Sequence, residues 1–282
     1  MKVAVIGASG GMGSFFVRFF LARGDSVRGS DLRPPKGAPK GFVFSKKSSE
    51  AVRGCDLTIL AVPMDKTVKA AADIAKSLKR GSVLVEIGSV KGGTLSSLRK
   101  LIGNEVKLLS IHPLFGPALE STAGMKVAVI SEEGEEPKLA AKLFPEATII
   151  PMGRKEHDQA MAVVLSLTHM LNIVYAGTVA KFMSPGEFAR VSTPNSSMQL
   201  TLAEAVLAQD PRLSFAIQSG NKYTRKVARA ALRELKLVLE MVEESDWNSF
   251  VANFTKLAKG YKTDKRASAV IREIYSAAQK TG

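Results

Sequence analysis

The chain has 282 residues, of which 45% are hydrophobic, and it is long enough for about two globular domains that each bury a core. Its single cysteine, Cys55, excludes an intramolecular disulfide and a thiolate metal cluster, so we expect a cytoplasmic protein. The net charge of +14 is spread over both halves and suits a protein that gathers small anions. Nucleic acid is the alternative partner for such a charge, but neither half is a basic tail, and we predict that none is bound.

The first predicted elements are a short apolar strand, Lys2–Ile6, a glycine-rich turn and an amphipathic helix at residues 14–23. This order is typical of a dinucleotide-binding site, where the N-terminus of the helix offers unpaired N–H groups to phosphates. We assign Gly7 to the tight turn, Gly10 to close approach of the backbone to a pyrophosphate, and Gly13 to packing of the helix on the strand. The spacing departs from G-x-G-x-x-G at its second glycine, so the turn alone is weak evidence.

A second strand, at residues 26–29, ends shortly before Asp31. This aspartate occupies the place of the acid that binds the adenosine ribose, which favours NAD over NADP. Three basic neighbours, Arg28, Arg33 and Lys36, could accept a 2′-phosphate, so NADP stays an alternative.

Further strands alternate with helical stretches along the first half of the chain. Residues 56–63 and 82–87 predict buried strands, with a helix at residues 66–78 between them. The alternation predicts an α/β fold, with a Rossmann-type, doubly wound parallel sheet over residues 1–151. Ligands bind beyond the carboxyl ends of such strands, so Ser89 and Lys91 should lie near a bound nicotinamide.

His112, an acid–base side chain, lies among residues that restrict the backbone in the segment Ser110-Ile-His112-Pro113-Leu-Phe-Gly116-Pro117. Residues 107–112 predict a strand, Pro113 keeps His112 extended, and Gly116-Pro117 predicts a turn. His112 should therefore lie at the carboxyl end of a strand, close to Ser89. The alternative is a core histidine that hydrogen-bonds a loop carbonyl.

The second half, residues 152–282, predicts an all-α domain. Residues 161–180 carry no formal charge and are long enough to span a bilayer, but they include Ser166, Thr168, His169 and Asn172. Such polar groups are costly in lipid, so we predict a helix buried among helices and no membrane span. This apolar surface exceeds what a small domain buries and predicts a homodimer that forms through the helical domain.

Two histidines of the helical half could suggest a metal site. On a regular helix His157 and His169 differ by about 120° around the axis, and neither has a partner at metal-ligand spacing. We therefore predict no metal, and we interpret His157 with Asp158 as a structural cap where the helix begins.

Together these motifs resemble those of the prephenate dehydrogenase family, over roughly residues 1–220. The resemblance rests on the glycine turn and on four later segments, which are Leu60–Pro63, Gly88–Gly92, His112–Pro117, and Glu156–Asp158 with Leu167–His169. It implies NAD(P)-dependent oxidative decarboxylation of prephenate to 4-hydroxyphenylpyruvate in tyrosine biosynthesis. The candidate cofactor-binding residues are Gly7, Ser9, Gly10, Gly11, Met12, Gly13, Asp31, Ala61, Val62 and Pro63.

The resemblance also implies roles at the substrate. His112 matches the histidine that accepts the proton of the substrate hydroxyl as hydride leaves the same carbon, which is general-base catalysis. Ser89 matches the serine that hydrogen-bonds this hydroxyl or the histidine, and His169 matches a histidine close to the substrate. We expect Lys91 to contact the substrate anion, with a solvated loop lysine as the alternative.

One departure from the family concerns the substrate carboxylates. Many members carry an arginine shortly before an Asp-Pro pair, but Ala205 stands in this stretch of the chain and no arginine is present there. Arg190 is our first candidate for the missing charge because it precedes a predicted loop at residues 192–196. Lys222 and Arg225 are the other candidates.

Three alternatives stay open. Arogenate could replace prephenate as the substrate. A hydroxyacid or imine-reducing dehydrogenase of the same two-domain plan would typically need a lysine four residues before an asparagine, where Thr168 precedes Asn172. A regulatory protein that senses NAD without turnover would be consistent with the missing arginine.

Overall fold

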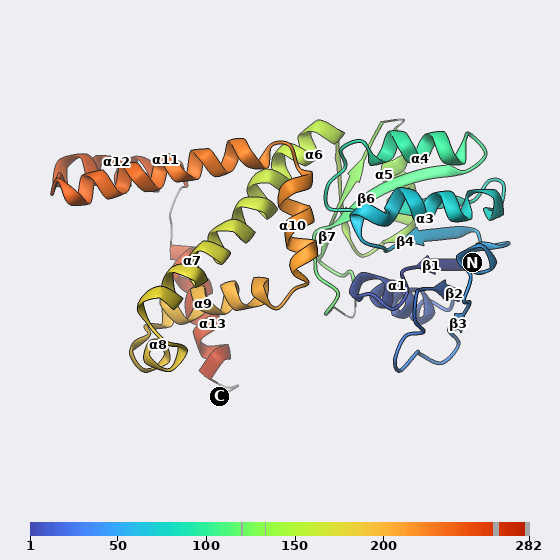
Figure 1. The fold of residues 1–282 in the computed structure, drawn as a ribbon, viewed down its shortest axis with the longest axis horizontal. Helices are drawn as coiled ribbons and strands as arrows, with labels where there is room; N and C mark the ends of the chain where they lie inside the picture. Colours follow the sequence, from blue (N-terminus) through green and yellow to red (C-terminus); the bar gives the residue numbers. More distant parts are fainter. Residues whose placement is uncertain (120, 133, 262–264, 280–282) are drawn as a thin grey trace. The chain divides into compact units, whose positions relative to one another are not determined.

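The computed structural model describes residues 1–119, 121–132, 134–261 and 265–279, which form an α/β part followed by helices (Figure 1). Contacts divide the chain into two compact units. The first comprises Met1–Ser166 and Pro211–Tyr223, and the second comprises Leu167–Asp210 and Thr224–Gly282. This division falls later in the chain than the predicted boundary at residue 151.

An eight-stranded sheet forms the centre of the first unit, in the order β3-β2-β1-β4-β5-β6-β7-β8. The strands are β1 Lys2–Ile6, β2 Ser26–Ser30, β3 Val43–Phe44, β4 Leu57–Leu60, β5 Val83–Glu86, β6 Lys107–Pro113, β7 Lys126–Ile130 and β8 Thr148–Met152. All neighbours run parallel except β6 and β7. The predicted Rossmann-type sheet is therefore confirmed, and β3, β7 and β8 are additional strands.

Helices cover both faces of this sheet. They are α1 Gly11–Ala22, α2 Ser48–Val52, α3 Thr67–Ile74, α4 Thr94–Ile102 and α5 Glu136–Leu143, with short 3-10 turns η1 Met64–Lys66 and η2 Ala75–Ser77. Val3 and Val5 pack in one core with α1 and α5, whereas Ala4 and Ile6 pack in the other with α2, α3 and α4. Because both faces are covered, β1 is a continuous apolar run.

The rest of the described chain is helical, which confirms the prediction of an all-α C-terminal part. It contains α6 Arg154–Met161, the π-helical turn η3 Ala162–Leu167, α7 Thr168–Phe182, α8 Pro185–Val191, α9 Pro194–Leu207, α10 Pro211–Gly220, α11 Thr224–Glu243, α12 Trp247–Gly260 and α13 Lys265–Gln279. The continuous stretch Arg154–Phe182 is the one described helix that is long and apolar enough to cross a membrane by length and composition.

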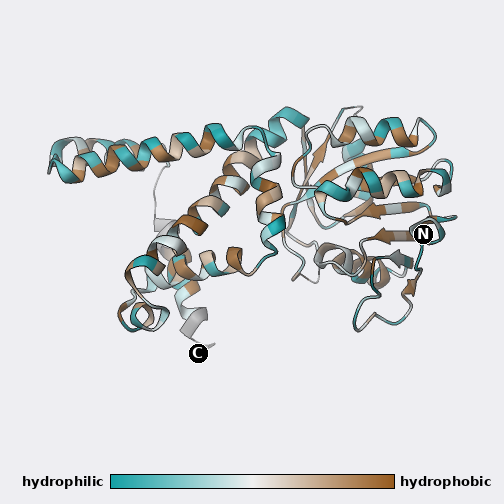
Figure 2. Cartoon of the chain, viewed as in Figure 1, coloured by the Kyte–Doolittle hydropathy of each residue, from teal (hydrophilic) through white to brown (hydrophobic). Residues whose placement is uncertain are grey.

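The helices of the second unit bury little apolar surface. On α7 the buried residues are His169 and Asn172, whereas Leu171, Ile173 and Val174 are exposed. Hydrophobic residues also recur along α11 and α12, where they alternate with hydrophilic ones (Figure 2). This pattern is the reverse of a monomeric helical domain, in which apolar side chains face the core.

Candidate active site

The glycine turn after β1 is shaped by its contact with the end of β4. Gly7 has a φ of 88°, which favours glycine, and a Cβ there would lie 2.4 Å from the carbonyl oxygen of Ala61. A Cβ on Gly13 would lie 1.9 Å from the carbonyl oxygen of Gly7. At Gly10 the nearest atom would be 3.4 Å away, an ordinary contact. Packing within the chain thus requires Gly7 and Gly13 but not Gly10, whose predicted role in the close approach of a pyrophosphate stays a prediction.

The N-terminus of α1 suits a phosphate. No side chain caps this end, and its first turn contains no acidic residue, so backbone N–H groups are available to an anion. Asp31 follows β2, and its carboxylate accepts hydrogen bonds from the N–H groups of Ser9 (2.9 Å) and Leu32 (2.6 Å). Ser9 in turn donates from Oγ to the carbonyl of Arg33 (2.7 Å). The turn and the acid are thereby held side by side, as a nicotinamide dinucleotide would need them.

The other candidate cofactor residues lie around the same turn. Ala61 donates its N–H to the carbonyl of Ile6 (2.8 Å), which places the segment Ala61–Pro63 beside the end of β1. A Cβ on Gly11 would lie 2.9 Å from Cγ of Pro117, so the glycine turn touches the loop that follows His112. Met12 packs against the core cluster that contains α1.

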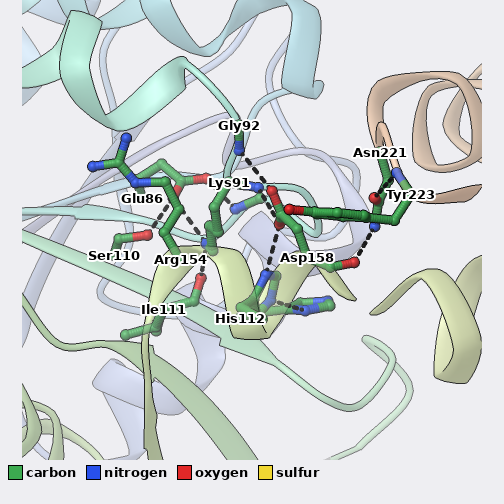
Figure 3. A network of polar contacts seen from close by, with 12 residues as sticks. Glu86, Lys91, Gly92, Ser110, Ile111, His112, Arg154, Asp158, Asn221 and Tyr223 are labelled. Atoms are coloured by element: carbon green, nitrogen blue, oxygen red, sulfur yellow. Dashed lines mark hydrogen bonds and ion pairs between the residues drawn. The ribbon is translucent and has the colours of Figure 1, made fainter. Parts of the chain in front are cut away.

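His112 lies in β6 with 7% of its surface exposed, and its imidazole contacts another histidine (Figure 3). Its Nδ1 lies 3.1 Å from Nε2 of His157, and Nδ1 of His157 lies 2.9 Å from Oδ1 of Asp158. An ionised carboxylate can only accept, so His157 donates to Asp158 and accepts from His112. Nε2 of His112 therefore carries the lone pair, which is the arrangement of a proton acceptor oriented by two further groups.

The surroundings of His112 keep it neutral. Burial holds the pKa of this imidazole well below its usual range, and the positive charge of Lys91 and the neighbouring His157 act in the same direction, whereas the negative charge of Asp158 opposes them. A neutral imidazole is the form that can accept a proton.

Asp158 is fixed by four hydrogen bonds. Besides His157, its carboxylate accepts from the backbone N–H groups of Lys91 (3.0 Å) and Gly92 (3.1 Å), and its carbonyl accepts from Nδ2 of Asn221 (2.6 Å). Burial acts to raise the pKa of the Asp158 carboxyl, but the hydrogen bonds from His157, Lys91 and Gly92 outweigh it and hold this pKa below its usual range. The carboxylate is thus charged at neutral pH.

The interpretation of Lys91 as a solvated loop lysine is wrong. Its side chain is 0% exposed, with Nζ 2.9 Å from Oε2 of Glu86 and 2.6 Å from the carbonyl oxygen of Ile111. The ammonium group lies inside the protein with these two partners, and this arrangement does not support the predicted contact of Lys91 with the substrate anion. Ser89 lies in the same loop and is half-buried, and its role stays a prediction.

The interpretation of His157 and Asp158 as a helix cap is also wrong. Helix α6 begins at Arg154, its N-cap is Gly153, and Oε2 of Glu156 accepts the N–H of Gly153 (3.3 Å). His157 and Asp158 lie inside the helix, where His157 binds His112 and Asp158 binds His157. Both belong to the segment Glu156–Asp158, which carries part of the family resemblance, and this is the signal that could have identified them.

The angular argument about His157 and His169 does not hold either, because it assumes a regular α-helix. The π-helical turn Ala162–Leu167 lies between them, and residues there turn by less than 100° each. Among the residues that the structure describes, no group of three or more His, Cys, Asp or Glu side chains could hold a metal ion.

In the second unit His169 is buried, and its Nδ1 has no hydrogen-bond partner among the described residues. Burial lowers the pKa of this imidazole. Asn172, one turn further, donates to the carbonyl of Thr168 (2.9 Å) and accepts from Nε2 of Gln199 (3.0 Å). Arg190 lies exposed on α8. The predicted roles of His169 and Arg190 at the substrate stay predictions.

Comparison with known proteins identifies two matching family models. The nucleotide-binding domain of prephenate dehydrogenase matches residues 23–131, and the prephenate dehydrogenase dimerization domain matches residues 154–256. A probable arogenate/prephenate dehydrogenase of Methanocaldococcus jannaschii is 24% identical over 97% of this chain, which spans 66% of that relative, just under two thirds of its length. A 4-amino-4-deoxyprephenate dehydrogenase of Streptomyces pristinaespiralis is 23% identical over 91% of this chain and 90% of that relative.

Among solved structures, the chain is similar in fold to the prephenate dehydrogenase of Aquifex aeolicus, crystallised with hydroxyphenyl propionate and NAD+. The TM-score is 0.76 at 18% identity, over 93% of this chain and 97% of the other. This likeness shows a shared two-part fold.

Proposed function

The chain belongs to the prephenate dehydrogenase family, and we propose that it is an NAD-dependent enzyme that converts prephenate to 4-hydroxyphenylpyruvate by oxidative decarboxylation in tyrosine biosynthesis. The observation that carries this proposal is the hydrogen-bonded chain from His112 through His157 to Asp158. It ends in a free lone pair at Nε2 of His112, on the strand whose following loop touches the glycine turn.

The chemistry follows from that lone pair. A bound nicotinamide supplies the hydride acceptor for the ring carbon that bears the hydroxyl. Nε2 of His112 takes the hydroxyl proton as the carbon–oxygen double bond forms, and His157 and Asp158 stabilise the resulting imidazolium. The bond to the ring carboxylate then breaks to release carbon dioxide, and its electron pair completes the aromatic ring. The oxygen takes the proton back from His112 and becomes the phenol.

NAD is the proposed cofactor because the carboxylate of Asp31 stands at the end of β2, beside the glycine turn. A negative charge there favours the ribose hydroxyls and repels a 2′-phosphate. NADP is the second candidate, supported by the basic residues Arg28, Arg33 and Lys36.

The substrate contacts are proposed from the second unit. A buried imidazole nitrogen without a partner is costly unless a ligand or water binds it, and this supports His169 as a substrate contact. Arg190, an exposed guanidinium, is proposed to bind a substrate carboxylate. Arogenate is the second candidate substrate, since the M. jannaschii relative is named for both compounds.

We further propose a homodimer that forms through the helical part, supported by the matched dimerization domain and by the exposed apolar side chains of α7, α11 and α12. A cytoplasmic location is proposed from the single, buried Cys55. The apolar helix Arg154–Phe182 is proposed to be no membrane span, because its first turns carry His157 and Asp158, which bind buried groups of the sheet unit.

The test combines purified protein with prephenate, arogenate or 4-amino-4-deoxyprephenate and with NAD or NADP, and follows the absorbance of the reduced nicotinamide. We expect the highest kcat/KM for prephenate with NAD. If no pair gives reduction while NAD still binds in calorimetry, the dehydrogenase proposal fails and a regulatory protein that senses NAD is favoured.

A further inference from the structure

The sheet changes its pairing next to His112. The parallel pairing of β5 with β6 ends at Glu86 and Ser110, and the antiparallel pairing of β6 with β7 begins at Ile111. The carbonyl of Ile111 therefore lies beyond the last residue that β5 can offer. The ammonium group of Lys91 reaches this carbonyl at 2.6 Å and takes the place of a strand partner (Figure 3).

A buried carboxylate holds the ammonium group in place. Oε2 of Glu86 lies 2.9 Å from Nζ of Lys91 and also accepts from Oγ of Ser110 at 2.8 Å. The two charged side chains are 0% and 2% exposed. A buried ion pair is tolerated when further hydrogen bonds satisfy its remaining donors and acceptors, as these do, and the result is a fixed geometry.

The backbone of Lys91 contacts the other side of the site. Its N–H donates to Oδ1 of Asp158, and the N–H of the next residue, Gly92, donates to Oδ2. Asp158 orients His157, and His157 binds Nδ1 of His112. Lys91 thus contacts the strand of His112 through its side chain. Its backbone is connected to the imidazole of His112 through Asp158 and His157.

We propose that Lys91 is the positioning residue of His112, which it fixes through the Ile111 carbonyl on one side and through Asp158 and His157 on the other. The inference rests on the proposed role of His112 as proton acceptor, but the placement itself can be measured without turnover. Lys91 makes no contact with substrate in this scheme.

The positive charge of Lys91 also lowers the pKa of His112. The charged and titratable groups near His112 are Lys91 from the loop after β5, with its partner Glu86 on that strand, and His157 and Asp158 from α6. After burial, the Lys91 charge is the largest cause that lowers the pKa of His112. Without this charge, His112 should take up a proton at higher pH.

The experiment measures the titration of the imidazoles by NMR in the full chain, which contains three histidines. The double variant Lys91→Met/Glu86→Gln removes both charges and leaves no buried carboxylate without a partner. We expect the midpoint of His112 to move up by roughly one pH unit and the acid limb of kcat/KM to move with it. The variant Lys79→Met/Asp56→Asn, which removes an exposed ion pair, is the control and should leave the midpoint unchanged.

A second variant tests the inference if the double variant does not fold. Lys91→Arg keeps the charge but changes the fit, so we expect an unchanged midpoint of His112 with kcat lowered about tenfold. An unmoved midpoint in the folded double variant overturns the inference, as does full kcat in Lys91→Arg. A shifted midpoint in a chain that reduces no cofactor would leave the placement intact and reject only the dehydrogenase function.

Discussion

The tautomer of His112, and therefore the nitrogen proposed to accept a proton, depends on Asp158, which does not contact His112. Asp158 can only accept hydrogen bonds, and this property sets the donor and acceptor roles of both imidazoles in turn. The same carboxylate stabilises the positive charge that appears on His112 during the reaction. Its effect passes through one more side chain than in a Ser-His-Asp triad, so it should be large but smaller than in a triad.

Asp158→Asn tests this control. The amide keeps the shape of the side chain but presents N–H groups to His157 or to the backbone donors of Lys91 and Gly92, so the tautomers are no longer enforced. We expect kcat to fall about a hundredfold with the dissociation constant of NAD unchanged. Steady-state kinetics and calorimetry measure the two quantities. Asp73→Asn, on the exposed part of α3, is the control, and an equal loss in both variants would contradict the relay.

Asp31→Asn tests the choice of cofactor. The amide oxygen can still accept the N–H of Ser9, so the turn keeps its shape while the negative charge is lost. We expect the ratio of kcat/KM for NAD to that for NADP to fall about tenfold, because a 2′-phosphate no longer meets a carboxylate. Kinetics with each cofactor give the ratio. A ratio equal to that of the wild type would remove Asp31 from cofactor discrimination.

At this scale the sequence predicts what depends on neighbouring residues and misses what depends on distant ones. Pro113 follows His112 directly, and the extended histidine at a strand end is where it was predicted. Lys91 stands among small residues in a loop and is typical of a solvated lysine, and only the fold brings Ile111 to it. The contact between His112 and His157 joins residues 45 positions apart.

Among the elements, the glycine turn contains one glycine required by packing, Gly13, and one proposed to be required by a ligand, Gly10. Two substitutions test these two roles. Gly13→Ala places a methyl group against the Gly7 carbonyl and should lower the free energy of unfolding by roughly 1–3 kcal/mol. Gly10→Ala meets no such atom, so it should leave stability unchanged and weaken NAD binding about tenfold. Denaturant unfolding and calorimetry distinguish the two. A large stability loss in Gly10→Ala would show that packing, not a ligand, requires that glycine.

Two strands show how far a local pattern predicts an element. The pentapeptide Lys-Val-Ala-Val-Ile forms both β1 and β7. A strand is predicted from this pattern only at β1, although β7 has the same five residues, and β1 runs parallel to its neighbours whereas β7 runs antiparallel to β6. Direction depends on the connection and the neighbouring strand, which the five residues do not encode. The change of direction at β6 is what leaves the Ile111 carbonyl for Lys91.

The π-helical turn Ala162–Leu167 is an element that periodicity could not predict. The mostly apolar residues at positions 161–167 fit an α-helix as well as a π-helix, so their composition does not distinguish the two. The π-helical turn changes the direction around the helix axis of every residue that follows it.

At the scale of the whole molecule, the exposed leucines of the helical part test the proposed dimer. Leu235 and Leu239 lie one turn apart on α11 and are 62% and 50% exposed. Leu235→Asp/Leu239→Asp places charges on this surface, and we expect the mass in light scattering to fall from about twice the chain mass of 30.2 kDa to that mass itself. Arg229→Glu, on the same helix, removes no leucine and should remain a dimer. A double variant that stays dimeric would place the interface elsewhere.

The stability of the whole chain should depend on pH through its buried histidines. The folded-state pKa values of His112 and His169 are both lowered, so below about pH 6.5 the unfolded chain binds protons that the folded chain refuses. The free energy of unfolding is therefore full above that pH and should fall as the pH drops toward 5, with a slope of at most about 1.4 kcal/mol per pH unit for each of these histidines. Denaturant unfolding between pH 5 and 8 gives the slope. His112→Asn removes one of the two groups and should reduce the slope, and a slope that the substitution leaves unchanged would mean that the fold does not lower the pKa of His112.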